Sequence, residues 1–472
     1  MARVKKYTSF KNRMVIVGFG SIGEGVLPLL LRHIGVKPEQ ISIITAEERG
    51  HDEARKYGVD FINNALTPAN YREMLEPRLD AGDFLVNVSV DVSSEALVDL
   101  CQQKGALYID TCIEPWPGVY HDPKLSPSRR SNYGLRDSVL ALRKKYPEGP
   151  TALLTHGANP GLVSHFVKQA LLNMAEATGL AVEEPKTREA WALLMEKLGI
   201  KVVHIAERDT QISERSKEQD EFVNTWSIDG FYSEGLQPAE LGWGTHEKHM
   251  PPDGHIHDFG SGAAIYLSRP GCTTRVRSWT PLEGAYQGFL ITHNEAISIS
   301  EYFSVKEGDK LRHRVTCHYA YHPCDDAILS LHELNGKNGK LQSKKRLMMK
   351  EIIEGTDELG VLLMGNKKGV YWYGSRLSIE EARRLVPHNN ATSLQVTAAV
   401  LAGVIWAIEN PKAGVVEPEQ VDFDRILDIA RPYLGELVGV WGKWSPLQGR
   451  GELFEEDIDK TDPWQFKNIR VV

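Results

Sequence analysis

The stretch Met14–Gly25, MVIVGFGSIGEG, decides the fold of this chain. It opens with four apolar residues, enough for a buried parallel strand, and continues into the spacing GxGxxG. The first glycine of this motif permits a tight turn, the second lets the backbone approach a pyrophosphate, and the third lets a helix pack on the strand. Apolar residues 26–31 then suit the buried face of that helix, whose N-terminus faces the phosphates. The motif predicts a dinucleotide-binding loop; the alternative is a glycine-rich turn without a nucleotide. The residues expected to bind the cofactor here are Gly18, Gly20, Ser21, Ile22 and Gly23.

Composition restricts the class of protein. At 472 residues the chain is long enough for about two or three domains, and 42% hydrophobic with 25% charged residues is typical of a soluble globular protein. A net charge of −8 argues against nucleic acid as a partner and suits a cationic ligand. The five scattered cysteines indicate reduced thiols in a cytoplasm. The N-terminus lacks an apolar signal core, and the apolar run 398–408 is shorter than a membrane span, so we expect no membrane association.

Strands and helices alternate over the first 160 residues, as in a Rossmann-type parallel sheet. The second strand, 41–44, usually ends at an acid that binds the adenosine ribose of NAD about 20 residues beyond the glycines. Here Thr45 occupies that place, with Glu47 and Glu48 close behind. No arginine follows immediately, although Arg49 is near, so NADP is not favoured either.

Polar residues follow the ends of the later strands of this sheet. Ligands of open α/β sheets bind beyond the carboxyl ends of the strands, so we expect these residues near one crevice, although each one alone is compatible with an ordinary loop. They are Ser89, Asp91, Thr111, Glu114, Ala158, Asn159 and Pro160.

The pattern changes after Gly161. A long amphipathic helix is predicted over 162–177, and 202–370 is rich in aromatics, glycines and short β-like runs, which predicts an α+β domain with a mostly antiparallel sheet. A capping box over 392–395 opens an apolar helix that we expect to pack back on the nucleotide domain. The predicted fold class is therefore α/β, with a Rossmann domain over 1–160, an inserted α+β domain over 161–385, and returning helices plus a tail over 386–472.

Acids beside aromatic residues mark the central domain, as in HIAERDTQ and NTWSIDGFYSEGLQPAELGWG. A carboxylate next to an aromatic face binds alkylammonium groups, since charge pairing fixes the cation and the ring adds about 0.5–2 kcal/mol. The alternative is a tryptophan-rich core with solvated acids. The segment Cys317–Cys324 has the residue types of a zinc site, but it has the pattern of a strand, with its histidines about 13 Å apart, so we predict no metal.

Motifs along almost the whole chain resemble the bacterial homospermidine synthase family. They include VGFGSIG, YIDTCIEPW, GANPGLVSHFVKQAL, HIAERDTQ, FVNTWSIDGFYSEGLQPAELGWGT, CHYAYHPCDDA and NATSLQVTAAVLAG. The resemblance implies a saccharopine dehydrogenase-like fold and a tightly held NAD. It further implies a homodimer, with substrate binding and dimerisation assigned to the domain over 161–385. It also implies aminobutyl transfer between two putrescines, or from spermidine to putrescine, through imines, with release of ammonia or diaminopropane and no net redox change.

The same resemblance implies roles for individual residues. It assigns substrate-amine binding and proton transfer to Glu114, Glu207 and Glu234. Trp226 would stabilise cationic imines through its face. The remaining expected site residues are His293, Asn159, Asp357 and Asp91, the last as a link between the cofactor and substrate regions. Two alternatives remain open: a net oxidoreductase of saccharopine-like substrates, which would want arginines in its pocket, and an NAD-binding sensor without catalysis.

Overall fold

The structure, a computed structural model, describes residues 5–472 apart from the side chain of His121, and divides them into two compact units. Unit 1 combines the N-terminal stretch up to Leu162 with Thr225–Gly230 and Ile379–Gly435. Unit 2 combines Val163–Asn224, Phe231–Ser378 and Glu436–Val472. The stretch 386–472, treated above as one C-terminal segment, is thus shared between the units, because its last residues form strands of the unit 2 sheet.

A seven-stranded parallel sheet is the centre of unit 1, with the strand order β24-β8-β7-β6-β2-β4-β5. Every residue of β2, β6 and β7 is buried, which explains their unbroken apolar runs: a parallel sheet covered on both faces has no solvent side. The strands are β2 Met14–Val17, β4 Ile41–Thr45, β5 Asp60–Asn63, β6 Phe84–Asn87, β7 Leu107–Asp110, β8 Ala152–Leu153 and β24 Val415–Val416. The main helices are α1 Ser21–His33, α2 His51–Tyr57, α4 Ser94–Lys104, α5 Asn132–Lys145, α11 Ile379–Leu385, α12 Ala391–Glu409 and α13 Phe423–Ala430. The Rossmann-type fold is confirmed.

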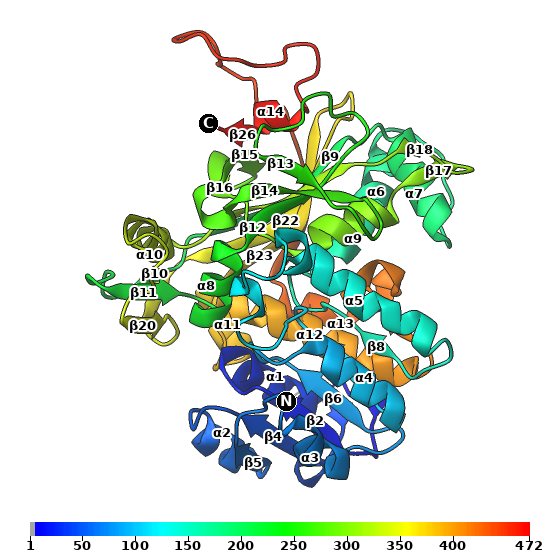
Figure 1. Cartoon of the computed structure of the whole chain (residues 1–472), viewed down its shortest axis with the longest axis vertical. Helices are drawn as coiled ribbons and strands as arrows, with labels where there is room; N and C mark the ends of the chain where they lie inside the picture. The colour runs from blue at the N-terminus through cyan, green and yellow to red at the C-terminus, as the bar shows by residue number, and fades with distance from the viewer. Residues whose placement is uncertain (1–4) are drawn as a thin grey trace. The chain divides into compact units, whose positions relative to one another are not determined.

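Helix α12 lies in the core of unit 1, where it contacts α1 and β7 (Figure 1). The approach is close enough that a Cβ at Gly403 would lie 2.6 Å from the Ile109 side chain. By length and composition α12 could cross a membrane, but 89% of its apolar window is buried inside the structure, as in a core helix. Its N-cap is Asn390 rather than the predicted Thr392, because the Asn390 backbone is extended and its amide oxygen accepts from the Ser393 N–H at 2.7 Å.

A mostly antiparallel eleven-stranded sheet is the centre of unit 2, as predicted. Its central strand β9, Val202–Asp209, pairs in parallel with β19, Thr316–His322, and antiparallel with β22, Thr356–Met364. The other strands are β12 Pro238–Gly242, β13 Gly254–Ile256, β14 Ala264–Pro270, β15 Arg275–Thr280, β16 Gly284–Phe289, β23 Val370–Ser378, β25 Glu436–Gly442 and β26 Arg470–Val471. The helices include α6 Leu162–Ala177, α7 Arg188–Lys197, α8 Ile228–Leu236, α9 Asn294–Tyr302, α10 Asp325–Gly336 and α14 Phe466–Ile469.

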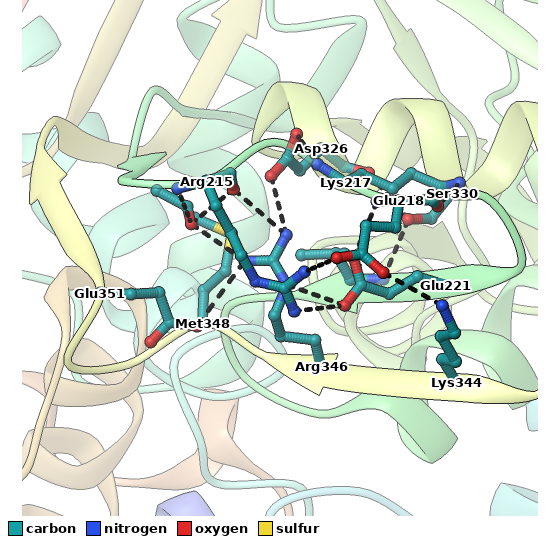
Figure 2. Close-up of polar contacts among 12 residues, drawn as sticks. Arg215, Lys217, Glu218, Glu221, Asp326, Ser330, Lys344, Arg346, Met348 and Glu351 are labelled. Atoms are coloured by element: carbon teal, nitrogen blue, oxygen red, sulfur yellow. Dashed lines mark hydrogen bonds and ion pairs between the residues drawn. The ribbon is translucent and has the colours of Figure 1, made fainter.

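A small two-stranded ribbon in unit 2 packs on helix α10 and carries a buried ion-pair network. Its strands β11, Glu221–Asn224, and β20, Lys344–Leu347, pair only with each other. The Arg346 guanidinium is 9% exposed and lies between Glu221 at 3.1 Å and Asp326 at 3.2 Å (Figure 2). Two strands alone are marginal in water, so this buried network supplies the fixed geometry of the ribbon.

Candidate active site

The glycine-rich loop of unit 1 has the geometry that a dinucleotide requires. Gly18 has φ +86°, and a Cβ there would lie 2.7 Å from the Ser89 backbone, so only glycine fits the turn. A Cβ at Gly20 would meet nothing within 4 Å, which leaves open space where a pyrophosphate must approach the backbone. A Cβ at Gly23 would lie 2.8 Å from the Gly18 carbonyl oxygen, so this glycine lets the start of α1 pack closely against the loop. Ile22 is the second residue of the same helix. The three glycines therefore fit a dinucleotide in the roles expected from the motif.

The end of β4 departs from the usual ribose site in the way the sequence indicates. Thr45 is buried, and its hydroxyl accepts from the Glu47 N–H at 3.5 Å, while Glu47 and Glu48 are exposed. The Arg49 guanidinium is engaged by the Glu24 carboxylate at 3.3 Å. A 2′-phosphate would have to compete with Glu24 for this arginine.

Buried polar groups form a floor beneath the ends of β6, β7 and β8. The Ser89 hydroxyl donates to Asn87 at 2.6 Å, the Asn87 amide donates to the Tyr108 hydroxyl at 3.1 Å, and Tyr108 donates to Asp110 at 2.8 Å. Burial raises the pKa of the Asp110 carboxyl to about 7, although the Thr155 N–H at 2.6 Å opposes the rise. These hydrogen bonds fix the loops that carry the expected cofactor residues, and no local sequence pattern predicts them.

Loops after β7 and β8 place the other expected residues of unit 1. A Cβ at Gly157 would lie 3.4 Å from the Thr111 side chain, so these two loops touch. Glu114 is 5% exposed; its N–H donates to Ser94, and its carboxylate accepts from the Tyr120 hydroxyl at 3.4 Å. The loop after β8 carries the buried Ala158 and Pro160 and the half-buried Asn159, whereas Asp91 is exposed with φ +60°.

Trp226 belongs to unit 1 as part of the short segment Thr225–Gly230, although the chain on either side of that segment belongs to unit 2. Its backbone carbonyl accepts a hydrogen bond of 2.6 Å from the Ser21 hydroxyl, at the start of α1. A Cβ at Gly230 would lie 2.9 Å from Cζ3 of the indole, so the ring packs against the first turn of α8. The half-buried indole is thus fixed beside the dinucleotide loop.

An acidic and aromatic cluster occupies one face of the unit 2 sheet. The register places Tyr321 of β19 and Leu359 of β22 beside Glu207 of β9. The Tyr319 hydroxyl donates to Oε2 of Glu207 at 2.5 Å, and the rings of Tyr319 and Tyr321 stack with centroids 4.9 Å apart. Asp357 is fully buried on the same face. Burial, followed by the carboxylates of Glu207, Asp209 and Asp357, raises the pKa of Tyr321 well above its ordinary value, so the phenol stays neutral.

His293 joins two further carboxylates to this cluster. Its Nε2 lies 3.2 Å from Glu234 and its Nδ1 lies 3.1 Å from Glu295, while its ring packs 4.4 Å from that of Tyr319. Burial by itself lowers the pKa of His293, but the carboxylates of Glu295 and Glu234 outweigh it and raise the pKa to about 10. His293 is therefore an imidazolium at neutral pH, a form that can donate a proton.

The structure brings the expected residues together in two groups. The group in unit 1 contains the glycine loop, Ser89, Thr111, Glu114, Asn159, Asp91 and Trp226, and the group in unit 2 contains Glu207, Glu234, His293 and Asp357. Sequence reasoning missed Glu295, Tyr319, Tyr321 and Asn390. Only the two tyrosines left a signal, since their spacing of two residues in a predicted strand puts both on one face.

Two family models together match almost the whole chain. Residues 14–153 match the saccharopine dehydrogenase NADP binding domain, and residues 157–443 match the saccharopine dehydrogenase C-terminal domain. The saccharopine dehydrogenase (L-Glu forming) of Saccharomyces cerevisiae shares the fold, with 9% identity, a TM-score of 0.51 and coverage of 91% of this chain and 99% of that one. The fold and site thus define a saccharopine dehydrogenase-like enzyme.

Closer relatives identify the family. A homospermidine synthase of Blastochloris viridis is 55% identical, with 98% of each chain covered, and one of Mesorhizobium japonicum is 51% identical, with 98% of this chain and 97% of the relative covered. The crystal structure of the Legionella pneumophila homospermidine synthase, solved in complex with NAD, is 54% identical, has a TM-score of 0.92 and covers 98% of each chain. The chain belongs to the homospermidine synthase family.

Proposed function

We propose that this chain converts two putrescines into homospermidine and ammonia with a bound NAD that is unchanged at the end of each cycle. Spermidine would serve as an alternative aminobutyl donor and would release diaminopropane. The observation that carries this proposal is the buried cluster of Glu207, Glu234, His293 and Tyr319 in a chain with a dinucleotide loop. In that cluster carboxylates outnumber cations, as a diammonium substrate requires.

The dinucleotide would be held by the loop from Gly18 to Gly23, with Ser89 and Thr111 at neighbouring strand ends. When bound, NAD supplies reversible hydride transfer, which oxidises an amine to an imine and later reduces a second imine. The Arg49–Glu24 pair supports NAD rather than NADP, because the one nearby arginine already has a carboxylate partner.

Substrate binding would use charge and aromatic faces together. The carboxylates of Glu207, Glu234 and Asp357 would pair with the ammonium ends of putrescine. The Trp226 face would stabilise the cationic imine, which contributes about 0.5–2 kcal/mol depending on desolvation. Attack of a second primary amine on the first imine, followed by loss of ammonia, gives an imine that joins two aminobutyl chains, so no lysine of the protein is consumed in the bond changes.

Proton transfers would use a carboxylate as the base and an imidazolium as the acid. The Glu207 carboxylate, held by the Tyr319 hydroxyl, would accept a proton from the amine that becomes the nucleophile. The His293 imidazolium would stabilise its two carboxylates and donate a proton to the departing ammonia. Glu114 would bind a substrate amine, Asn159 would line the site, and Asp91 would link the cofactor and substrate regions.

A stoichiometric assay tests this function. Purified protein is incubated with putrescine without added NAD or reductant, and homospermidine, ammonia and absorbance at the NADH band are followed. We expect one ammonia for each homospermidine and no NADH accumulation beyond one equivalent of enzyme. NADH formed in proportion to product would indicate a net oxidoreductase of the saccharopine type, and bound NAD without any product would indicate a sensor.

We further propose a cytoplasmic homodimer. The five cysteines carry free thiols, which supports a reducing compartment.

Residues 451–457, between β25 and α14, are all exposed, and in Figure 1 this loop (red) extends away from the sheet of its unit. It exposes 83% of Leu453 and 75% of Phe454, and a cavity of about 550 Å³ lined by Arg277, Tyr286 and Trp444 lies at its base. A second copy would cover these apolar side chains. Light scattering on a sizing column should give a dimer for the wild type and a monomer for Phe454→Ser; a wild-type monomer would contradict this proposal.

A further inference from the structure

The segment that carries Trp226 is held at three consecutive carbonyl groups. The Asn224 carbonyl accepts from the Met348 N–H at 2.8 Å, the Thr225 carbonyl accepts from the Asn390 side-chain amide at 2.5 Å, and the Trp226 carbonyl accepts from the Ser21 hydroxyl at 2.6 Å. The first of these bonds lies within unit 2 and the other two lie within unit 1, where the chain passes from one unit to the other. Three donors from distant parts of the sequence thus fix the backbone on which the indole is mounted.

Asn224, the residue before Thr225, is anchored within unit 2. Asn224 is the last residue of β11, and β11 is fixed by the buried pair between Glu221 and Arg346 (Figure 2). Ser330 adds a further anchor, since its hydroxyl accepts from the Val223 N–H at 2.9 Å. These contacts fix the position of Asn224 within unit 2.

Asn390 uses both ends of its amide. The oxygen caps α12 through the Ser393 N–H at 2.7 Å, and the nitrogen donates to the Thr225 carbonyl. The side chain is fully buried, so its orientation is set by these partners. Aspartate would also cap the helix, but its carboxylate has no hydrogen to donate. Serine would cap it too, but its hydroxyl is one bond shorter than the amide, so it does not reach the Thr225 carbonyl while it caps α12. Asparagine combines the cap with the reach to Thr225.

Ser21 lies in the glycine-rich loop, but its hydroxyl makes a contact outside that loop. Backbone N–H groups at a helix N-terminus bind a pyrophosphate, so the hydroxyl of Ser21 is not needed for that purpose. The hydroxyl is instead engaged with the Trp226 carbonyl. We propose that Ser21 and Asn390 are positioning residues for Trp226, which hold its indole where a substrate cation is stabilised. This inference rests on the cation-binding role of Trp226 in the proposed function.

The indole itself has little freedom on this backbone. Gly230 lies one turn into α8, and a Cβ there would come within 2.9 Å of the ring. Alanine is a better helix former than glycine, so Gly230→Ala should not unfold α8. The added Cβ would also lie 3.0 Å from the Ser227 hydroxyl, so both this side chain and the indole must shift. The variant therefore moves the ring while the fold is kept.

Four variants of the full-length protein test the inference: Ser21→Ala, Asn390→Ser, Gly230→Ala and, as a control, Ser138→Ala. The control removes a hydroxyl of the same unit that donates to the Leu135 carbonyl at 2.9 Å. We expect the first three to keep bound NAD and to lose about tenfold in kcat/KM for putrescine. Gly230→Ala should retain the wild-type Tm, and Ser138→Ala should leave both NAD content and kcat/KM unchanged.

A double-mutant cycle with Trp226→Ala then decides whether the positioning residues act through the indole. We expect Ser21→Ala to cause less than a twofold further loss once the indole is absent. An equal tenfold loss in both backgrounds, or loss of NAD from Ser21→Ala, would overturn the inference. Full activity of the Trp226→Ala single variant would instead refute the cation-binding role on which the inference rests.

Discussion

Replacement of Glu207 by glutamine should reduce catalysis strongly while leaving the fold intact. The carboxylate lies on the central strand of unit 2, 2% exposed, and accepts from the Tyr319 hydroxyl at 2.5 Å. Glutamine has the same shape and keeps an oxygen for Tyr319, so the substitution removes the charge and leaves the packing. The lost quantity is the attraction between this charge and a substrate ammonium or imine.

The size of the loss follows from the burial of the carboxylate. A hydrogen bond to a charged group contributes about 1.5–3 kcal/mol, and two unit charges about 4 Å apart attract by about 4 kcal/mol at an effective dielectric constant near 20. The substitution should therefore remove about 2–4 kcal/mol of transition-state stabilisation. This corresponds to a decrease of roughly 30- to 1,000-fold in kcat/KM for Glu207→Gln.

The assay measures homospermidine formation against putrescine concentration, with Tm and NAD content measured on the same samples. Glu358→Gln is the matched control, since Glu358 is also 2% exposed and lies on the adjacent strand β22, where it accepts from the Leu282 N–H and the Arg376 guanidinium. The control should lower Tm while kcat/KM changes less than about threefold. A Glu207→Gln enzyme within twofold of wild type would refute the electrostatic reasoning.

Three further outcomes follow from the geometry. Gly20→Val should lose NAD, because a side chain there fills only the space of the pyrophosphate. NAD content is measured by chromatography of the denatured protein, and the Tm should equal that of NAD-stripped wild type. Full NAD content would mean that the phosphates bind elsewhere. His293→Phe leaves Glu234 and Glu295 without their cation and should lower the free energy of unfolding by about 3–5 kcal/mol. Because the pKa of His293 is raised to about 10, the gap between wild type and variant should persist at low and neutral pH and close as pH rises through 10; equal urea midpoints at pH 8 would contradict this. Burial lowers the pKa of His318 to about 4, so wild type should lose stability relative to His318→Gln as pH falls from about 6.5 to 4; parallel stability curves over that range would exclude a buried neutral imidazole.

Elements whose sequence pattern lies in neighbouring residues could be predicted from the sequence. The strand before the glycine loop and helix α6 at Leu162–Ala177 follow from apolar runs and helical periodicity, and both stand where predicted. The pairing of Glu207 with Tyr319 was not predictable in this way, since strands β9 and β19 lie more than a hundred residues apart and their register depends on the whole sheet.

The helix cap of α12 shows a second limit. Two overlapping patterns, at Asn390 and at Thr392, both suit a helix start by residue type. Burial against Thr225 selects Asn390, because its amide has a second partner there. A contact between segments so distant in sequence decides a local feature, and local propensity contains no information about it.

The place of α12 in unit 1 also governs the order in which the newly made chain can fold. The ribosome releases the parallel strands β2 to β8 early, but the helix that covers them and the edge strand β24 are made more than two hundred residues later. At about 5–20 residues per second, the part of the sheet that α12 covers stays exposed for on the order of ten seconds or more. During translation this sheet is a natural client for chaperones, and a messenger truncated before residue 391 would yield a fragment that aggregates.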